Sequence, residues 1–421
     1  MATARERGEG YEIRRFKPED REPYLDLYEQ VFGDRREEYF DWRFVDNPYA
    51  DSVPIHVATV DGTLVGGRSS LVLPLSVGRE RVRAIMQVDP MVHPEYRGQG
   101  LFTRMVEAVY DHYAPTDVGI SIGFPSNAVR SALEKMAERL SITAGVIETF
   151  PQHYRIQRPT ALIENGGAVR TLAKLAAPVA DGYLGARDRL ADRGTVGDLT
   201  VERYDEPPVD VLTALAAGGA PNGIHAVRDE EFYRWRFENP RYEYVTYVAY
   251  QGTEPVASLT AGTRTDQSTT VTHVSDVLPL GGASQNSAGA SSAMTKADRT
   301  TKAGRTTKAG RTTITDRTTI AGRTRTEPNR AEAFTQLLGR LVDDHRGADL
   351  IAAAGWALPR NVLAAYGFHD DTRPPLDRFT DSNYFVARPV AQEHVTDWKI
   401  GHIRPGDRNS WLLSFCEREI G

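Results

Sequence analysis

The sequence has a single cysteine, Cys416, in 421 residues. One thiol excludes an intrachain disulfide framework and a cysteine-rich zinc site. A lone cysteine near the end of the chain is more often a small packing residue than a nucleophile. No apolar run reaches the roughly 18 residues that a membrane span needs. The ten histidines contain no His-x-x-x-His pair, so we expect no metal site. The charged start of the chain lacks an apolar stretch. Together these absences predict a cytoplasmic protein that uses neither a membrane nor a metal.

Positive charge is scarce outside one segment of the chain. Residues 291–326 contain nine Lys or Arg and two Asp, a balance of +7, whereas the whole chain carries −6. The rest therefore carries −13, and such an acidic body argues against nucleic acid as the main partner. The length suggests about two or three domains, and the apolar share of 40% is ordinary for a folded protein.

The basic segment is a repeat of six residues, of the type Thr-Lys-Ala-Gly-Arg-Thr, from Thr295 to Thr324. It contains almost no large apolar residue, so it cannot bury enough surface to offset the entropy of ordering it. We therefore predict a disordered low-complexity insertion over residues 281–326. A nucleic-acid or phosphate-binding tail is the alternative, but evenly spaced basic residues without aromatics do not favour it. A hexapeptide β-helix would need a large aliphatic residue in each repeat.

A longer pattern occurs twice. Residues 39–48, Tyr-Phe-Asp-Trp-Arg-Phe-Val-Asp-Asn-Pro, return as Phe-Tyr-Arg-Trp-Arg-Phe-Glu-Asn-Pro at residues 232–240. Each copy ends a predicted helix. Alternating strand signals follow both copies, at residues 55–60, 64–73, 244–250 and 255–261. A strand, a Gly-aromatic break and a helix then follow in both halves, beginning at Val118 and Leu350. The sequence therefore predicts two copies of one architecture.

The strongest chemical signal follows the first pair of strands. A short apolar strand over residues 84–88 is interrupted by Asp89 and Pro90. Because proline cannot donate to a sheet, the strand should bulge there and leave a gap for a ligand. Arg97-Gly98-Gln99-Gly100 then leads into an amphipathic helix. Two glycines at a strand-to-helix turn let backbone N–H groups approach an anion, which the helix N-terminus also attracts. The pattern predicts a phosphate site.

Two common phosphate motifs do not fit this segment. A P-loop needs Gly-Lys-Ser/Thr at the end of its loop, and the segment has none. A dinucleotide fingerprint needs a small residue at position 103, where Thr103 stands, and an acid at the end of the following strand. Asp117 begins that strand instead.

At these residues the sequence resembles the GNAT family of acyl-CoA N-acyltransferases, whose pyrophosphate loop reads Arg/Gln-x-x-Gly-x-Gly/Ala after a bulged strand. Arg97 to Gly100 match, whereas Phe102 replaces the final Gly or Ala. Gly123-Phe-Pro-Ser-Asn127 is similar to the break of a two-domain subgroup. The resemblance covers residues 11–154 and only the architecture of the second half. It implies an α/β (α+β) fold of two GNAT-like domains, each a mixed, mostly antiparallel twisted sheet flanked by helices.

The resemblance also implies roles for individual residues, with acetyl-CoA as the co-substrate. Backbone groups of Met91 and Val92 would bind the acetyl and pantetheine amides, and Asn127 would hydrogen-bond the pantetheine arm. The pyrophosphate would be held by Arg97, Gly98, Gln99, Gly100, Leu101, Phe102 and Thr103. From the sequence alone, a helix N-cap explains Asn127 equally well.

Amine acetylation requires a proton acceptor and a proton donor for the thiolate. Asp89, beside the predicted bulge, is the candidate base or amine-binding carboxylate, although a residue that caps the strand end explains it as well. The helix after Asn127 lacks the tyrosine that family members often use as the acid, so this role is unassigned. Arg43 is the candidate acceptor-binding residue, whereas Trp42 and Phe44 are more typical of a core.

A competing motif surrounds Ser121. Residues 119–123, Gly-Ile-Ser-Ile-Gly, match the Gly-x-Ser-x-Gly of a serine hydrolase, which places its serine on a sharp turn. The alternation of Val118, Ile120 and Ile122 instead predicts one strand that runs through Ser121. A hydrolase is therefore the weaker hypothesis.

The second copy has a strand at residues 271–278, but the insertion stands where its pyrophosphate loop should follow. The predicted organisation is a GNAT domain over 1–155, a helical connector over 156–200, a degenerate GNAT-like domain over 201–390 and a C-terminal tail over 391–421. The degenerate copy is expected to pack on the first and shape its acceptor cleft.

The sequence thus predicts an N-acetyltransferase that moves an acetyl or short acyl group to the amine of a small-molecule or protein acceptor by direct attack. A hydroxyl acceptor is an alternative. Two other hypotheses stay open. One is a non-catalytic acyl-CoA-binding regulatory or interaction protein, which the missing tyrosine and Phe102 favour. The other is a tandem-domain aminoacyl transferase that uses charged tRNA, although its basic surface is missing outside the insertion.

Overall fold

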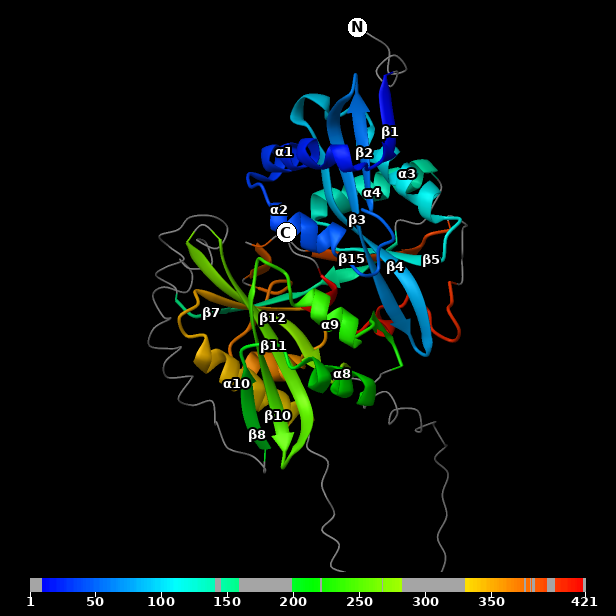
Figure 1. Ribbon diagram of the computed structural model, residues 1–421. Helices are drawn as coiled ribbons and strands as arrows, with labels where there is room; N and C mark the ends of the chain where they lie inside the picture. The colour runs from blue at the N-terminus through cyan, green and yellow to red at the C-terminus, as the bar shows by residue number, and fades with distance from the viewer. Residues whose placement is uncertain are drawn as a thin grey trace, which may run out of the picture.

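The computed structural model describes residues 10–140, 145–158, 199–219, 222–266, 268–281, 330–374, 376–378, 380, 383–391 and 398–418. The predicted insertion over 281–326 and the predicted connector over 156–200 lie almost entirely outside these residues. The described chain forms two mixed α/β halves, each built on one mostly antiparallel sheet (Figure 1). The predicted fold class is confirmed. No helix in the described part of the chain is both long and apolar enough to cross a membrane.

The first half is built on sheet A, which has eight strands. Its order is β1 (Tyr11–Arg15), β2 (Ile55–Val60), β3 (Thr63–Val77), β4 (Glu80–Val92), β5 (Val118–Gly123), β15 (Asn383–Pro389) and β6 (Val146–Phe150), with β9 (Ile224–Ala226) paired to the end of β3. β4 and β5 are parallel, whereas their other neighbours are antiparallel. The strands predicted at 55–60 and 64–73 correspond to β2 and β3.

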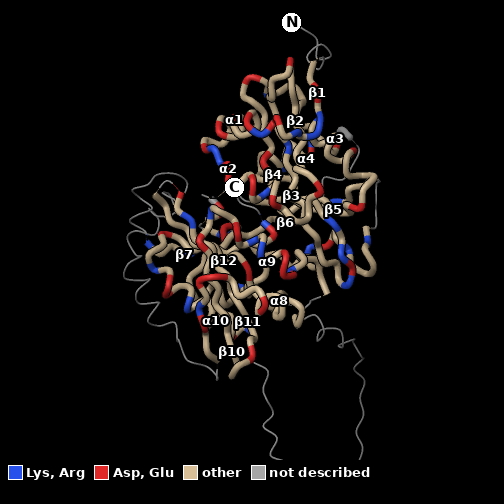
Figure 2. The backbone as a smooth tube through the Cα atoms, in the orientation of Figure 1, with Lys and Arg blue, Asp and Glu red and all other residues tan. Residues whose placement is uncertain are grey.

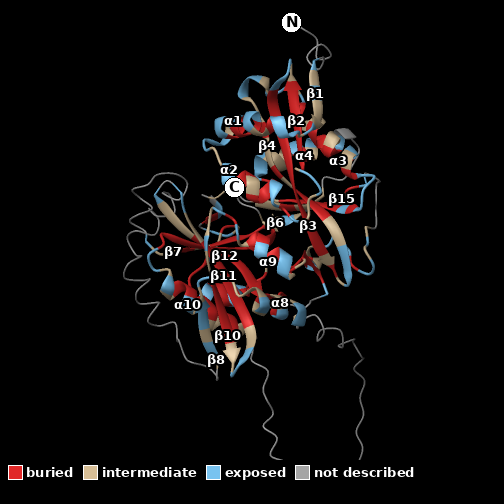
Figure 3. Ribbon diagram, in the orientation of Figure 1, coloured by how far each residue is buried: buried red, intermediate tan, exposed pale blue. Residues whose placement is uncertain are grey.

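Helices cover both faces of sheet A. Alternate residues of β3 point to opposite faces. Leu71 belongs to the same core as Tyr24 of α1 (Arg21–Phe32), whereas Val72 packs with Val106 of α3 (Leu101–Tyr113) and with α4 (Asn127–Leu140). β3 is therefore buried along almost its whole length, as Figure 3 shows.

The second half is built on sheet B, which has seven strands. Its order is β14 (His369–Asp370), β7 (Gln152–Ile156), β13 (Leu350–Ala354), β12 (Thr269–Leu278), β11 (Glu254–Asp266), β10 (Glu243–Gln251) and β8 (Leu199–Tyr204). α10 (Arg330–Asp344) packs on β10 and β11, and α8 (Val209–Gly218) packs on β11 and β12. Acidic and basic residues are interspersed over both halves (Figure 2).

The two halves exchange strands. β7 follows β6 in sequence but pairs with β13 and β14 of sheet B. β15 lies late in the chain but inserts between β5 and β6 of sheet A, where Arg388 lies opposite Ser121. A division of the chain into contiguous domains over 1–155 and 201–390 remains a prediction, and β15 joins the sheet of the other predicted domain.

The two copies of the repeated pattern, residues 39–48 and 232–240, contact each other between the two halves. Its first copy forms α2 (Glu37–Phe40) and the π-helix η3 (Asp41–Val45), and its second forms α9 (Glu230–Arg236). The rings of Trp42 and Trp235 stack with centroids 5.5 Å apart. Each indole N–H donates to the backbone carbonyl of the other tryptophan, at 2.7 and 2.9 Å. This reciprocal contact is what two copies of one architecture would produce.

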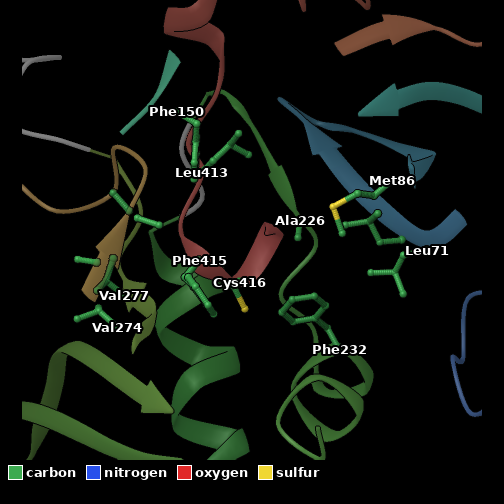
Figure 4. Packing of buried hydrophobic residues seen from close by; sticks show 14 of the residues in the cluster. Leu71, Met86, Phe150, Ala226, Phe232, Val274, Val277, Leu413, Phe415 and Cys416 are labelled. Atoms are coloured by element: carbon green, nitrogen blue, oxygen red, sulfur yellow. The ribbon is translucent and has the colours of Figure 1, made fainter. Parts of the chain in front are cut away.

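The C-terminal segment packs in the interior of the molecule. Trp411 is fully buried, and η8 (Phe415–Glu417) contacts both β12 and β9. Figure 4 shows Leu413, Phe415 and Cys416 among the core side chains of these strands. Burial raises the pKa of the Cys416 thiol, so this cysteine has the environment of a packing residue. The other short elements are η2 (Pro18–Asp20), η4 (Pro94–Tyr96), α11 (Arg360–Ala365), η6 (Leu376–Arg378) and η7 (Arg408–Ser410).

Candidate functional site

A gap opens between β4 and β5. Their parallel pairing ends where Met86 lies opposite Ile122, and β5 ends one residue later, whereas β4 continues to Val92. At Asp89 the backbone has a φ of 41°, and the register with β3 shifts between Gly67 and Ser69. The predicted bulge is thus present. Within the described chain, β4 has no strand partner on its β5 side after Met86, which leaves that backbone edge to a ligand.

The turn from β4 into α3 has the shape of an anion site. Gly98 and Gly100 have φ of 76° and 79°, a region that favours glycine, and a Cβ on either residue would meet no atom within 4 Å. Gly100 is the N-cap of α3 and has no side chain with which to cap the first turn. The first N–H groups of a helix have no partner within the helix, and the helix dipole favours an anion at this end.

Hydrogen bonds and buried side chains hold the loop of residues 97–103 in place. The Tyr11 hydroxyl donates to Oε1 of Gln99 at 2.6 Å. Arg97 is exposed, and its Nε donates to the carbonyl of Val92 at 3.1 Å. Leu101 is buried, and Phe102 and Thr103 are half-buried. The side chains of Leu101, Phe102 and Thr103 thus anchor the turn, so this part of α3 would offer backbone N–H groups to a phosphate.

The remaining predicted cofactor residues flank the gap. Met91 is buried on the β4 side, opposite Gly67, and Val92 follows it. Asn127 begins α4 on the β5 side and is exposed, and its Oδ1 accepts a hydrogen bond from Nη2 of Arg130 at 3.0 Å. Asn127 is thus the first helical residue, and its amide lies at the surface.

The candidate base and the candidate acceptor residue are in contact. Nη1 of Arg43 donates to Oδ2 of Asp89 in an ion pair whose side chains are 1% and 15% exposed. The π-helix η3 carries Arg43 inward, and its guanidinium lies 5.2 Å from the ring centroids of both Tyr39 and Phe44. The ion pair fixes the orientation of the carboxylate. Nothing in the sequence indicated that these residues, 46 positions apart, would meet.

Aromatic side chains surround this ion pair on the α1 face of sheet A. A narrow pocket is lined by Tyr24, Tyr28, Tyr39 and Phe40 together with Arg43 and Asp89. Burial and the neighbouring Asp89 raise the pKa of Tyr28 to about 12. A carboxylate ringed by aromatic faces suits a protonated amine.

A larger cavity, of about 190 Å³, opens on the α3 and α4 face of the same gap. Asp89 borders it as well, and Val129 and Leu133 of α4 form one wall. Its polar lining includes Arg68, Gln87, Tyr110, Ser121 and Arg388. Sequence reasoning did not identify Arg68, Gln87 or Arg388. Arg68 was detectable as a lone charge within the apolar strand signal of residues 64–73, whereas Arg388 reaches the cavity only through the exchange of β15.

Ser121 does not occupy a nucleophile elbow. It lies inside β5, where it pairs with Ile85 on β4 and with Arg388 on β15. Its hydroxyl is buried and accepts a hydrogen bond from Tyr110 at 2.7 Å. The strand that the alternating residues predicted therefore runs through this serine.

Comparisons with known proteins agree with this geometry. The sequence of residues 12–133 matches the family model of an acetyltransferase (GNAT) domain. A sequence comparison with curated proteins gives no match.

Solved structures with a similar fold include three acyltransferases or probable acyltransferases. A GCN5-related N-acetyltransferase from Anabaena variabilis has 13% identity and a TM-score of 0.50, over 90% of this chain and 73% of that chain. An N-myristoyltransferase from Saccharomyces cerevisiae has 11% identity and a TM-score of 0.52, over 90% and 80%. A probable N-acyltransferase from Enterococcus faecalis has 10% identity and a TM-score of 0.51, over 90% and 72%.

At these identities the structural likeness concerns the fold alone, and the family follows from the sequence of the first half. The gap beside the bulge at Asp89 and the turn at Gly98 and Gly100 lie within the matched residues. The chain therefore contains a GNAT-family acetyltransferase domain at residues 12–133.

Proposed function

We propose that this protein transfers an acetyl or short acyl group from acyl-CoA to an amine. The observation that carries the proposal is the gap between β4 and β5, together with the turn after β4 that has two positive-φ glycines. The loop and first helical turn, from Arg97 to Thr103, would hold the pyrophosphate through backbone N–H groups. Backbone groups of Met91 and Val92 and the amide of Asn127 would bind the pantetheine arm.

In the proposed reaction the acceptor nitrogen attacks the thioester carbonyl carbon directly. The N–C bond forms and the C–S bond breaks, the amine proton passes to Asp89 directly or through water, and the CoA thiolate takes a proton. Asp89 is suited to this role because it borders both the aromatic pocket and the larger cavity. Arg43 would orient the carboxylate and contact the acceptor.

A second candidate function is acyl-CoA binding without turnover. The ion pair between Arg43 and Asp89 favours it, because it occupies the carboxylate that would accept the proton. The two functions differ in one measurement, the release of CoA from acetyl-CoA in the presence of a panel of primary amines.

Calorimetric titration of CoA and acetyl-CoA tests the binding site first. We expect micromolar binding to the wild-type protein and at least tenfold weaker binding to Gly98→Glu, whose carboxylate would enter the anion site. Gly62→Glu is the matched control, because Gly62 also has a positive φ, 80°, and open space at its Cβ, in the turn before β3. No wild-type binding would overturn the proposal.

The role of Asp89 is tested by Asp89→Asn. We expect turnover to fall by about 10²- to 10⁴-fold, the usual contribution of a general base, while the Kd for acetyl-CoA stays within twofold. Asp61→Asn is the control, because Asp61 is also an aspartate with positive φ, 49°, but lies in an exposed turn. Equal turnover in the two variants would exclude Asp89 as the base.

A further inference from the structure

Two arginines are buried in the wall of the larger cavity. Arg68 projects from β3 and is 3% exposed, and Arg388 projects from the exchanged strand β15 and is 8% exposed. Nε of Arg68 donates to Oε1 of Gln87 at 2.8 Å, and Nε of Arg388 donates to the hydroxyl of Tyr110. Both partners are neutral, so neither hydrogen bond compensates the charge.

Neither guanidinium forms an ion pair with a carboxylate of the described residues. Nη1 of Arg388 is buried without a hydrogen-bond partner. Burial lowers the pKa of Arg68 to about 10; Tyr110 and Asp89 oppose this shift, and the nearby Arg388 adds to it. Asp89, the acid that borders the cavity, is paired with Arg43. The guanidinium groups of Arg68 and Arg388 face the rings of Phe102 and Tyr110, at 5.4 and 4.1 Å from the centroids. The cavity lining nevertheless holds three arginines and one carboxylate, an excess of positive charge that favours an anion.

The cavity lies beside the gap in which the proposed acyl-CoA would bind, since residues of both β4 and β5 line it. Arg68, Gln87, Ser121 and Arg388 lie on the face of sheet A that α3 and α4 cover, and the turn at Gly98 leads into α3 on the same face. The volume of about 190 Å³ is more than ten times the roughly 10–15 Å³ that a cavity needs to hold one water molecule. It accommodates a chain longer than an acetyl group.

We propose that the acyl group of the CoA thioester ends in a carboxylate, as in malonyl, succinyl or glutaryl groups, and that Arg68 and Arg388 bind this carboxylate. The inference rests on the proposed function and specifies its donor. A carboxylate matches the planar donor fork of a guanidinium and offers lone pairs to the unpartnered Nη1. The carboxylate is unchanged in the reaction, so the bonds that form and break are those of amine acylation.

The test compares donors that differ only in the terminal group. Free CoA, butyryl-CoA and succinyl-CoA are titrated into the full-length protein by calorimetry. Butyryl and succinyl groups have the same number of carbons, but only succinyl carries a carboxylate. We expect succinyl-CoA to bind at least tenfold more tightly than butyryl-CoA. Equal binding, or tighter binding of butyryl-CoA, would overturn the inference.

Substitutions of the two arginines test whether they cause the preference for succinyl-CoA. Arg68→Gln and Arg388→Gln are each expected to reduce the ratio of butyryl-CoA to succinyl-CoA Kd values to below threefold, with free CoA as the internal reference. Arg81→Gln, at a residue whose side chain is 55% exposed on β4, should retain the wild-type ratio. A ratio that persists in both cavity variants would overturn the assignment of these arginines.

The wild-type comparison of donors decides the proposal even where a variant does not fold. Binding of free CoA without preference for succinyl-CoA would overturn only this inference, whereas no binding of free CoA would overturn the proposed function as well.

Discussion

Both sheets split in the same place, between a long strand and its parallel neighbour. One gap borders a cavity, whereas the C-terminal segment lies beside the other. In sheet A, β4 and β5 separate after Met86, and the gap borders a cavity lined by buried arginines. In sheet B, β12 and β13 separate after Val274, and the C-terminal segment lies beside the split. The backbone N–H of Trp356 donates to the carbonyl of Leu413 at 3.1 Å, and Phe415 stacks on His273 with ring centroids 4.5 Å apart.

The two halves also differ in how their buried arginines are paired with acids. In sheet B, Arg228 is buried between Asp276 and Glu417, at 2.9 and 2.7 Å, and every side chain of this group is at most 3% exposed. In sheet A, Arg68 and Arg388 lack such partners among the described residues. In sheet B the chain itself thus supplies the counterions of the buried Arg228, whereas the buried arginines beside the gap in sheet A face a cavity. The comparison therefore favours the first half as the place of the proposed ligand site.

The largest effect is expected where the two halves meet. Trp42→Ala removes the stack on Trp235 and the hydrogen bond that the Trp42 indole donates, and should lower the free energy of unfolding by about 5 kcal/mol. Chemical denaturation measures this. Val45→Ala is the control, because Val45 lies in the same π-helix but is 53% exposed. Similar losses in the two variants would show that the tryptophan pair does not join the halves.

A smaller effect is expected from opening the second gap. Glu417→Gln removes one acid from the buried Arg228, and should cost about 3 kcal/mol and increase hydrogen exchange in residues 398–418. Glu230→Gln, which breaks an exposed pair with Arg234, should cost below about 1 kcal/mol. Unchanged exchange in the tail would contradict the role given to Glu417.

The contribution of Glu417 should depend on pH. Burial alone would raise the pKa of Glu417, but Arg228 and backbone N–H groups lower it below its ordinary value of about 4.3. A carboxyl with a lowered folded pKa stabilises the fold above its unfolded pKa and loses this contribution as the pH falls through the folded value. The stability difference between wild type and Glu417→Gln should therefore be constant from pH 6 to 5 and shrink below about pH 4.

The smallest effects on stability are expected at two glycines, Gly98 in the turn after β4 and Gly355 directly after β13. Gly355 and Gly98 have nearly equal φ, 78° and 76°, but a Cβ on Gly355 would lie 2.4 Å from the carbonyl oxygen of Leu413, whereas one on Gly98 meets nothing. Gly98→Ala should cost about 1 kcal/mol from backbone strain alone. Gly355→Ala should cost about 2–3 kcal/mol, because the tail must also shift. Thermal unfolding distinguishes these values, and equal costs would mean that the tail does not constrain Gly355.

The parts of the site that depend on local backbone chemistry were predictable. Pro90 cannot complete a ladder, so a bulge at Asp89 follows from the sequence, and the glycines at 98 and 100 indicate a turn with positive φ. The strands over 55–60 and 64–73 follow from alternation. In contrast, no local signal pairs Arg43 with Asp89, because their contact depends on how η3 packs against the bulge.

The sequence by itself determined the duplication, the bulged strand and the glycine turn, since each arises from interactions between residues close in the chain or from a visible repeat. Tertiary structure decided which strands each sheet contains and which of the two gaps is filled. Arg388 reaches the cavity of the first half from β15, and Glu417 pairs with the buried Arg228 of the second half, although both lie near the end of the chain. Such contacts form between residues hundreds of positions apart, and they depend on complementary shape and charge that no short segment of sequence encodes.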